Sequence, residues 1–155
     1  MFRDAARIGV RGIVAFSDPL PRTIGDRLLM PGHVGIVYQA LGAVYTGRGT
    51  ARWLTMLPDG SVLSARTLAK ITAAEPGSNG AIARLVEWGA PPKPERVPGR
   101  EWLPEALVAV GARRIWHPGN HRYAWSIGPR WSRRAHPVAL PALPYPKQSD
   151  LGLAA

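Results

Sequence analysis

The sequence predicts a single domain of the α+β class, in which a mixed sheet is flanked by helices. The length of 155 residues suits one domain. A short apolar run over residues 13–16 is typical of a buried strand. An Asp-Gly pair at residues 59–60 lies between two alternating segments and indicates a β-hairpin. Helical spacing is found at Val34, Val37, Tyr38 and Leu41.

In the first half of the chain, strands and helices are expected to alternate. Residues 1–11 should hold the last turns of a helix that ends at Gly9. Residues 19–31 carry three prolines and a glycine, and this composition favours a loop. The other elements expected here are a buried strand over 13–16 that ends at Ser17 and Asp18, a helix over 33–41, and a strand that starts over 43–46.

The second half is expected to hold two hairpins and three short helices. The first hairpin joins residues 52–57 to 61–65 through Asp59-Gly60, and the second joins 113–116 to 121–127 through Pro118-Gly119-Asn120. The helices are expected over 67–72, 79–88 and 101–110, with a proline-rich linker over 90–99 and an extended segment over 137–146. The domain should cover residues 1–147, and residues 148–155 should form a disordered tail.

The charge balance favours a polyanionic partner. Twenty Lys and Arg residues stand against ten Asp and Glu, which gives a net charge of +10. Arginine dominates the basic residues and suits bidentate contacts to phosphate, so nucleic acid is the first partner to consider. The alternative is a genome rich in G and C, which raises arginine, alanine, glycine and proline content without any role in binding.

The composition also limits the class of protein. The absence of cysteine excludes disulfides, thiolate catalysis and cysteine-bound metals, and it fits a reducing compartment. No apolar run approaches the roughly 18 residues that a membrane span needs, and no secretory signal is visible. The expected location is the cytoplasm, which is that of the host cell if the chain is phage-encoded.

The first candidate site lies where the strand over 13–16 ends. Asp18, next to Ser17, can orient an amine, act as a base, or bind a metal together with His33. Alternatively, Asp18 caps a turn before Pro19. Tyr38, on the following helix, is either a general acid or a core tyrosine with one hydrogen-bond partner.

The second candidate site is the basic and aromatic segment from Arg113 to Arg134. No acidic residue occurs between Ala106 and Ser149, and tryptophan and tyrosine are interleaved with the arginines. Arginine can contact phosphate while the aromatic rings stack on bases, although a solvated basic hairpin with its tryptophans in the core is the alternative. Arg66 is either a further phosphate contact or part of a helix start.

An ordered set of short motifs resembles a known family. Residues 35–44 resemble a segment of GCN5-related N-acetyltransferases, and the chain looks more closely similar to the Mom family of phage DNA-modification proteins. The matching motifs are Phe16-Ser17-Asp18-Pro19, Gly32-His33-Val34-Gly35, Val37-Tyr38-Gln39-Ala40, Tyr45-Thr46-Gly47, Asp59-Gly60 with Arg66-Thr67-Leu68, Asn120-His121-Arg122-Tyr123, Arg130 with Arg133-Arg134, and Leu143-Pro144-Tyr145-Pro146-Lys147.

The resemblance implies an enzyme that modifies the N6 amine of adenine and so protects phage DNA from restriction. Asp18, Tyr38 and Ser17 would be catalytic, His33 and Asp18 would hold an iron ion, and the adenine would be flipped out of the duplex. An acyl-CoA donor is implied by fold analogy alone. The residues expected to contact substrate or DNA are Gln39, Tyr45, Arg66, Arg122, Tyr123, Arg130, Arg133 and Arg134.

The chain departs from the family pattern at several points. Residues 20–31 form an insert, Leu41-Gly42-Ala43 replaces a Thr-Asn-Trp step, and Ser64-Ala65-Arg66-Thr67 replaces His-Ser-Arg-Thr. The N-terminal half of the N-acetyltransferase fold is expected to be missing, and a second chain would then supply it. Two rival functions stay open: a non-catalytic DNA- or RNA-binding protein, and an N-acyltransferase that acts on a small molecule.

Overall fold

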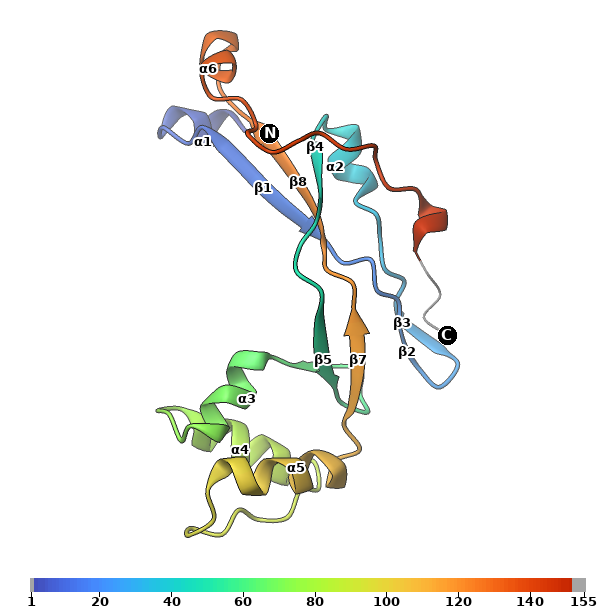
Figure 1. Ribbon diagram of the computed structural model, residues 1–155, viewed down its shortest axis with the longest axis vertical. Coiled ribbons are helices and arrows are strands. Elements are labelled where there is room, and N and C mark those ends of the chain that lie inside the picture. Colours follow the sequence, from blue (N-terminus) through green and yellow to red (C-terminus); the bar gives the residue numbers. More distant parts are fainter. Residues whose placement is uncertain (1, 152–155) are drawn as a thin grey trace. The chain divides into compact units, whose positions relative to one another are not determined.

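The computed structural model describes residues 2–151 and has an α+β fold with several small antiparallel sheets (Figure 1). The chain divides into two compact units. Unit 1 contains residues 1–22, 30–51 and 118–155, and unit 2 contains residues 23–29 and 52–117. The two units differ in charge: unit 1 holds ten basic and three acidic residues, whereas unit 2 holds ten basic and seven acidic residues.

Unit 1 is built on a three-stranded antiparallel sheet. The strands β1 (Gly12–Ser17), β8 (His121–Ser126) and β4 (Val44–Arg48) lie in the order β1-β8-β4. The unit also holds α1 (Arg3–Arg7), α2 (Ile36–Ala40), α6 (Arg130–Ala135) and a 3-10 turn over Gln148–Asp150. The segment after α6 runs beside β4, and the Leu143 amide donates a hydrogen bond of 2.9 Å to the Tyr45 carbonyl there.

The core of unit 1 is aromatic. Tyr123, which is fully buried at the centre of β8, lies 5.3 Å from the ring of Tyr45 and 5.4 Å from that of Tyr38. Trp125 follows on the same face and contacts Phe2 and Tyr38 at ring separations of 5.4 and 5.8 Å. These rings join one strand to its neighbour and to α1 and α2, so the short helices depend on the sheet for their stability.

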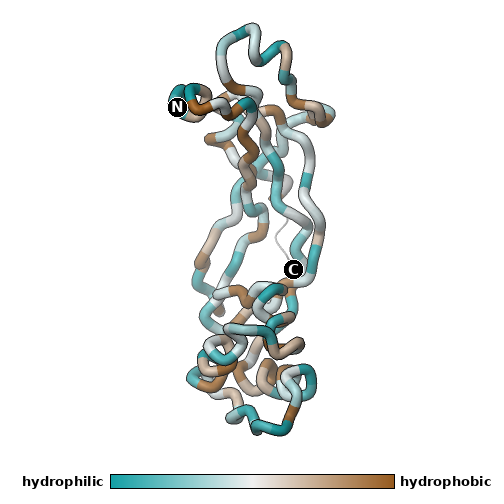
Figure 2. Tube along the Cα trace, turned by 90° about the vertical axis from the view of Figure 1, so that its left-hand side faces the viewer, coloured by the Kyte–Doolittle hydropathy of each residue, from teal (hydrophilic) through white to brown (hydrophobic). Residues whose placement is uncertain are grey.

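Unit 2 combines a second antiparallel sheet with a helical core. The strands β6 (Val62–Leu63), β5 (Arg52–Met56) and β7 (Arg113–His117) lie in the order β6-β5-β7. The helices α3 (Ala65–Thr72), α4 (Ser78–Glu87) and α5 (Gly99–Ala109) pack together. Their buried residues include Ile71, Leu85, Trp102, Leu103 and Ala106. The chain trace in this part of the molecule carries both hydrophobic and hydrophilic residues (Figure 2).

Local signals explain several boundaries in unit 2. The side chain of Ser64 accepts a hydrogen bond from the Thr67 amide at 3.0 Å and so caps α3. Between β5 and β6, the Asp59 carboxylate accepts from the Ser61 amide at 2.9 Å. Hydrogen bonds from Ser61 hold the pKa of Asp59 below its usual value. Ordinary turn and capping chemistry therefore fixes this part of the chain.

Four sequence expectations are wrong. The strand at Ile13 is not buried on both faces, since Val14 and Phe16 are 56% and 51% exposed. Residues 19–31 contain a two-stranded sheet of β2 (Arg22–Ile24) and β3 (Arg27–Met30) rather than a loop. The helix after it begins at Ile36, so His33 precedes it, and Val37 on its supposed apolar face is 67% exposed.

The fourth correction concerns the supposed second hairpin. The strands β7 and β8 do not pair with each other: β7 pairs with β5, and β8 pairs with β1 and β4. The sequence signal at Pro118-Gly119-Asn120 marks a connection between two sheets. Gly119 has a φ of +92°, and a Cβ there would lie 2.1 Å from the carbonyl oxygen of Gly49, so this connection needs glycine.

Other expectations are confirmed. The first hairpin and the helices α3, α4 and α5 lie within a few residues of their predicted positions, and residues 137–146 contain neither helix nor strand. The single domain over 1–147 stays a prediction, because two compact units can still unfold together. Of the expected tail, residues 148–151 begin with the 3-10 turn, and residues 152–155 lie outside the described residues. Within residues 2–151, every helix is too short or too polar to cross a membrane.

Candidate functional site

Both carboxylate oxygens of Asp18 have hydrogen-bond partners within its own turn. Oδ1 accepts from the Leu20 amide at 2.9 Å, and Oδ2 accepts from Arg22 Nη2 at 2.5 Å. The side chains of Asp18 and Arg22 are each only 21% exposed. This is the turn-capping geometry that the sequence offered as an alternative, and the guanidinium beside the carboxylate disfavours its use as a base.

The residues near His33 fit an iron ion poorly. The backbone amide of His33 donates to the Asp18 carbonyl at 2.8 Å, while the imidazole is exposed. The Asp18 carboxylate is already paired with a cation, and the described part of the chain holds no group of three or more His, Cys, Asp or Glu side chains that could bind a metal. We therefore derive no step through iron.

Ser17 and Tyr38 both pack against Gly35 in unit 1. Ser17 is fully buried, and among the described residues its hydroxyl has no hydrogen-bond partner. The Tyr38 hydroxyl donates a long hydrogen bond of 3.5 Å to the Phe16 carbonyl. Gly35 fits between them: a Cβ there would lie 3.1 Å from Ser17 Oγ and 3.0 Å from Tyr38 Cδ2. Ser17 and the ring of Tyr38 therefore both pack closely against Gly35.

Gln39 and Tyr123 belong to one buried network. The Tyr123 hydroxyl donates a hydrogen bond to the Val34 carbonyl. Gln39 Nε2 lies within hydrogen-bond distance of three acceptors: the Val34 carbonyl at 3.0 Å, the Tyr123 hydroxyl at 3.2 Å and the Pro146 carbonyl at 3.2 Å. Burial raises the pKa of the Tyr123 phenol above its usual value of 10.0. The network ties α2 and the C-terminal segment to β8, and Tyr123 cannot stack on a base while it is buried.

Tyr45 and Arg122 are also engaged inside unit 1. The Tyr45 hydroxyl lies 2.9 Å from His121 Nδ1, and Tyr45 is only 8% exposed. Arg122 donates from Nε to Thr46 Oγ1 at 2.9 Å and from Nη2 to the Thr46 carbonyl at 3.0 Å. These contacts bind β4 to β8 and give both residues a structural role.

Arg66 lies in unit 2, on α3. Its guanidinium forms an ion pair with Glu75, with 2.6 Å between Nη2 and Oε2. The arginine side chain remains 68% exposed, so the pair contributes little to stability. Arg66 thus belongs to unit 2, whereas the other expected DNA contacts belong to unit 1.

The remaining expected DNA contacts, Arg130, Arg133 and Arg134, share the short helix α6 and are all exposed. Trp131 on the same helix is 69% exposed, whereas Ser132 is fully buried and anchors the helix. Three cations and one accessible indole within six residues form a compact basic surface. Within unit 1, these arginines are the expected DNA contacts whose side chains are exposed to a ligand.

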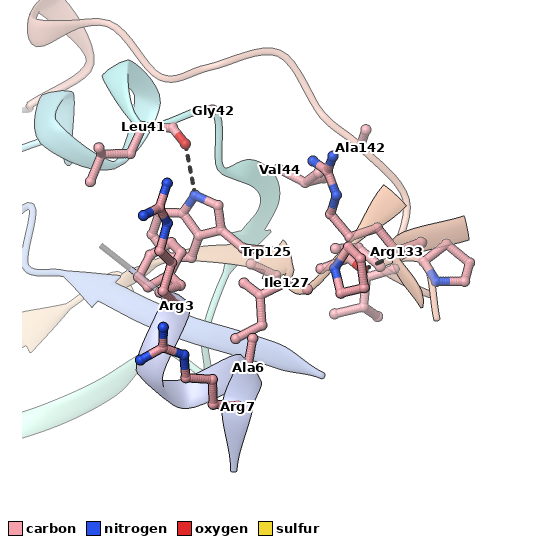
Figure 3. A pocket seen from close by; sticks show the side chains of 18 residues that line it. Arg3, Ala6, Arg7, Leu41, Gly42, Val44, Trp125, Ile127, Arg133 and Ala142 are labelled. Atoms are coloured by element: carbon pink, nitrogen blue, oxygen red, sulfur yellow. Dashed lines mark hydrogen bonds between the residues drawn. The ribbon is translucent and has the colours of Figure 1, made fainter. Parts of the chain in front are cut away.

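A cavity of about 1240 Å³ lies between α6, α1 and the end of β8. Its charged lining residues are Arg3 and Arg7 from α1 and Arg133 from α6, and no carboxylate of the described residues lines it (Figure 3). Trp125 forms part of the apolar lining and donates from Nε1 to the Leu41 carbonyl at 3.0 Å. Three guanidinium groups around an apolar lining suit an anion that carries planar or apolar groups.

The arginines of α1 were missed by the sequence reasoning. Arg3 and Arg7 are four residues apart, and this spacing places them on one face of a helix. That signal was visible, but only the tertiary structure shows that this helix lies beside α6. Asp18, Tyr38 and Ser17 do not line the cavity.

The comparisons with known proteins add no relative: no protein-family model, curated protein or solved structure matches this chain. The resemblance to the Mom family therefore rests on the short motifs alone.

Proposed function

We propose that this protein binds DNA through the basic surface of unit 1. The observation that carries the proposal is the cavity between α1 and α6, which, within residues 2–151, is lined by three arginines and by no carboxylate. Phosphates would contact Arg3, Arg7 and Arg133, and the apolar lining would accept sugar or base. The charge of unit 1, with ten basic and three acidic residues, favours the same polyanion.

The ionic-strength dependence of binding tests this proposal. Arg3→Ala with Arg133→Ala removes two charges from the cavity, and Arg96→Ala with Arg100→Ala removes two exposed charges from unit 2 as a matched control. Fluorescence anisotropy with a labelled duplex would give the slope of log affinity against log salt concentration. The cavity variant should lower the magnitude of that slope by about 2, and the control by much less. An equal decrease in both variants would indicate a non-specific effect of net charge and contradict the proposal.

Modification of the adenine N6 amine stays a prediction from the family resemblance. Asp18 is paired with Arg22, and Ser17 and Tyr38 are packed around Gly35, so the geometry favours the non-catalytic binding protein among the alternatives. Mass spectrometry of nucleosides, from DNA of cells that express the chain with and without its genomic neighbour, tests the enzymatic alternative. A modified adenosine that disappears in Asp18→Ala, with the variant shown by urea denaturation to be folded, would establish the enzyme.

The acyl-CoA donor and a second chain that completes an N-acetyltransferase fold are likewise predictions. The phosphates of coenzyme A would suit the same three arginines, so coenzyme A is the competitor to include in the DNA titration. Displacement of DNA at low ligand concentration, combined with weak and salt-insensitive DNA binding, would favour the small-molecule N-acyltransferase instead.

A further inference from the structure

The sheet of unit 2 carries a pair of exposed tryptophans. Trp53 on β5 and Trp116 on β7 are directly opposite each other in the antiparallel register. Their ring centroids are 5.2 Å apart, and their planes meet at 66°. The side chains are 53% and 51% exposed. Large aromatic residues usually bury most of their area, so two half-exposed indoles on one sheet face indicate a surface for a ligand.

An arginine completes this surface. Arg114 lies two residues before Trp116 on the same face of β7, and its guanidinium carbon is 5.0 Å from the centre of the Trp53 ring. The contact is a cation–π interaction that restrains both side chains. Leu54 and Ile115, which project from the opposite face, are half-buried. The aromatic face is therefore the more accessible side of a sheet whose other side is partly covered.

The charges on the sheet select the ligand. The three strands carry no acidic residue, and on the face of the two tryptophans the charged side chain is Arg114, because Arg52 and Arg113 alternate onto the opposite face. A ligand that matches this face needs negative charge together with flat aromatic groups that can stack. Single-stranded nucleic acid repeats both features at every nucleotide. In a duplex the base faces are covered by neighbouring base pairs, so a stacking surface of this kind favours unpaired bases.

We infer that Trp53, Trp116 and Arg114 form a second nucleic-acid site, which binds unpaired bases by stacking. The site belongs to unit 2 and does not depend on the cavity of unit 1. Trp53 and Trp116 offer their exposed ring surfaces to one or two bases, and Arg114 lies where a flanking phosphate would pass. Stacking is sequence-tolerant because each base has an aromatic face, so we expect little base preference.

The experiment compares a labelled oligothymidylate with a labelled duplex, using the full-length protein. Trp53→Ala with Trp116→Ala should weaken oligothymidylate binding roughly fivefold to 100-fold, as expected for the loss of one stacked base. Binding of the duplex should change less than about twofold, since its bases are already stacked. Trp53→Phe with Trp116→Phe keeps flat rings and should retain most of the affinity, so it separates the loss of stacking from a loss of fold.

Trp88→Ala is the matched control. Trp88 lies on the same unit beside Arg84, whose guanidinium carbon is 5.5 Å from its ring, but it faces no second tryptophan. This variant should bind oligothymidylate like the wild type. An unchanged affinity in the double alanine variant, an equal loss in Trp88→Ala, or tighter binding of an oligoglutamate peptide than of oligothymidylate would each overturn the inference. Failure of the duplex to bind at all would instead contradict only the function proposed for unit 1.

Discussion

Arg22 Nη2 donates to Asp18 Oδ2 at 2.5 Å, and this ion pair closes the turn between β1 and β2. The pair changes how the motif Phe16-Ser17-Asp18-Pro19 is interpreted. A carboxylate that holds a guanidinium and a backbone amide is a structural acceptor, and removal of it leaves two donors without their partner. Any loss of activity on mutation of Asp18 must therefore be separated from a loss of stability.

Asp18→Ala should lower the free energy of unfolding by about 1–3 kcal/mol, because the pair is mostly buried and the Leu20 amide also loses its acceptor. Urea denaturation of the purified variant measures the change. Asp4→Ala is the control, since Asp4 pairs with Arg7 at 3.5 Å on a fully solvated surface and should have little measurable effect. Equal stability of Asp18→Ala and the wild type would return Asp18 to the candidates for catalysis.

Gly35→Ala should destabilise the protein by about 2–4 kcal/mol, through overpacking added to the strain of a left-handed backbone. Gly35 has a φ of +72°, and an added Cβ would lie 2.7 Å from Tyr123 Cε2. Gly42→Ala is a matched control, because Gly42 has a φ of +69° and nothing lies within 4 Å of its added Cβ. Gly42→Ala should lower the free energy of unfolding by only about 1 kcal/mol, which is the strain of placing alanine in a left-handed backbone conformation. Thermal unfolding of both variants measures their difference in stability. Equal melting temperatures would show that the side chains around Gly35 can move to make room for the added Cβ.

The buried phenol of Tyr123 predicts a loss of stability at high pH. Its pKa is raised in the folded state, so the folded protein retains a proton that the unfolded chain releases above the usual value of 10.0. The free energy of unfolding should be constant with respect to this group below about pH 10 and should fall as the pH rises further. Tyr123→Phe should be less stable than the wild type at neutral pH, because Val34 and Gln39 lose a partner. Urea denaturation above pH 10 should show that the difference in free energy of unfolding between the wild type and Tyr123→Phe becomes smaller as the pH rises. A difference that does not depend on pH would contradict a raised pKa for Tyr123.

Much of the secondary structure follows from local sequence signals. The Asp59-Gly60 turn, the Ser64 cap and the apolar spacing of α3, α4 and α5 each act over a few residues, so the sequence alone locates these elements. The basic composition likewise suggests a polyanion without reference to the fold. Propensity and turn chemistry are properties of neighbouring residues, which explains why these predictions are accurate.

Strand pairing and the candidate sites were decided only by the tertiary structure. The signal around Gly119 is the same for a hairpin as for a connection between sheets, and long-range packing selects β5 as the partner of β7. For the same reason no local pattern reveals that Trp53 faces Trp116 or that Arg3 shares a cavity with Arg133. Strand pairing depends on the cross-strand neighbours and burial that the whole chain provides, and these contacts join residues far apart in sequence.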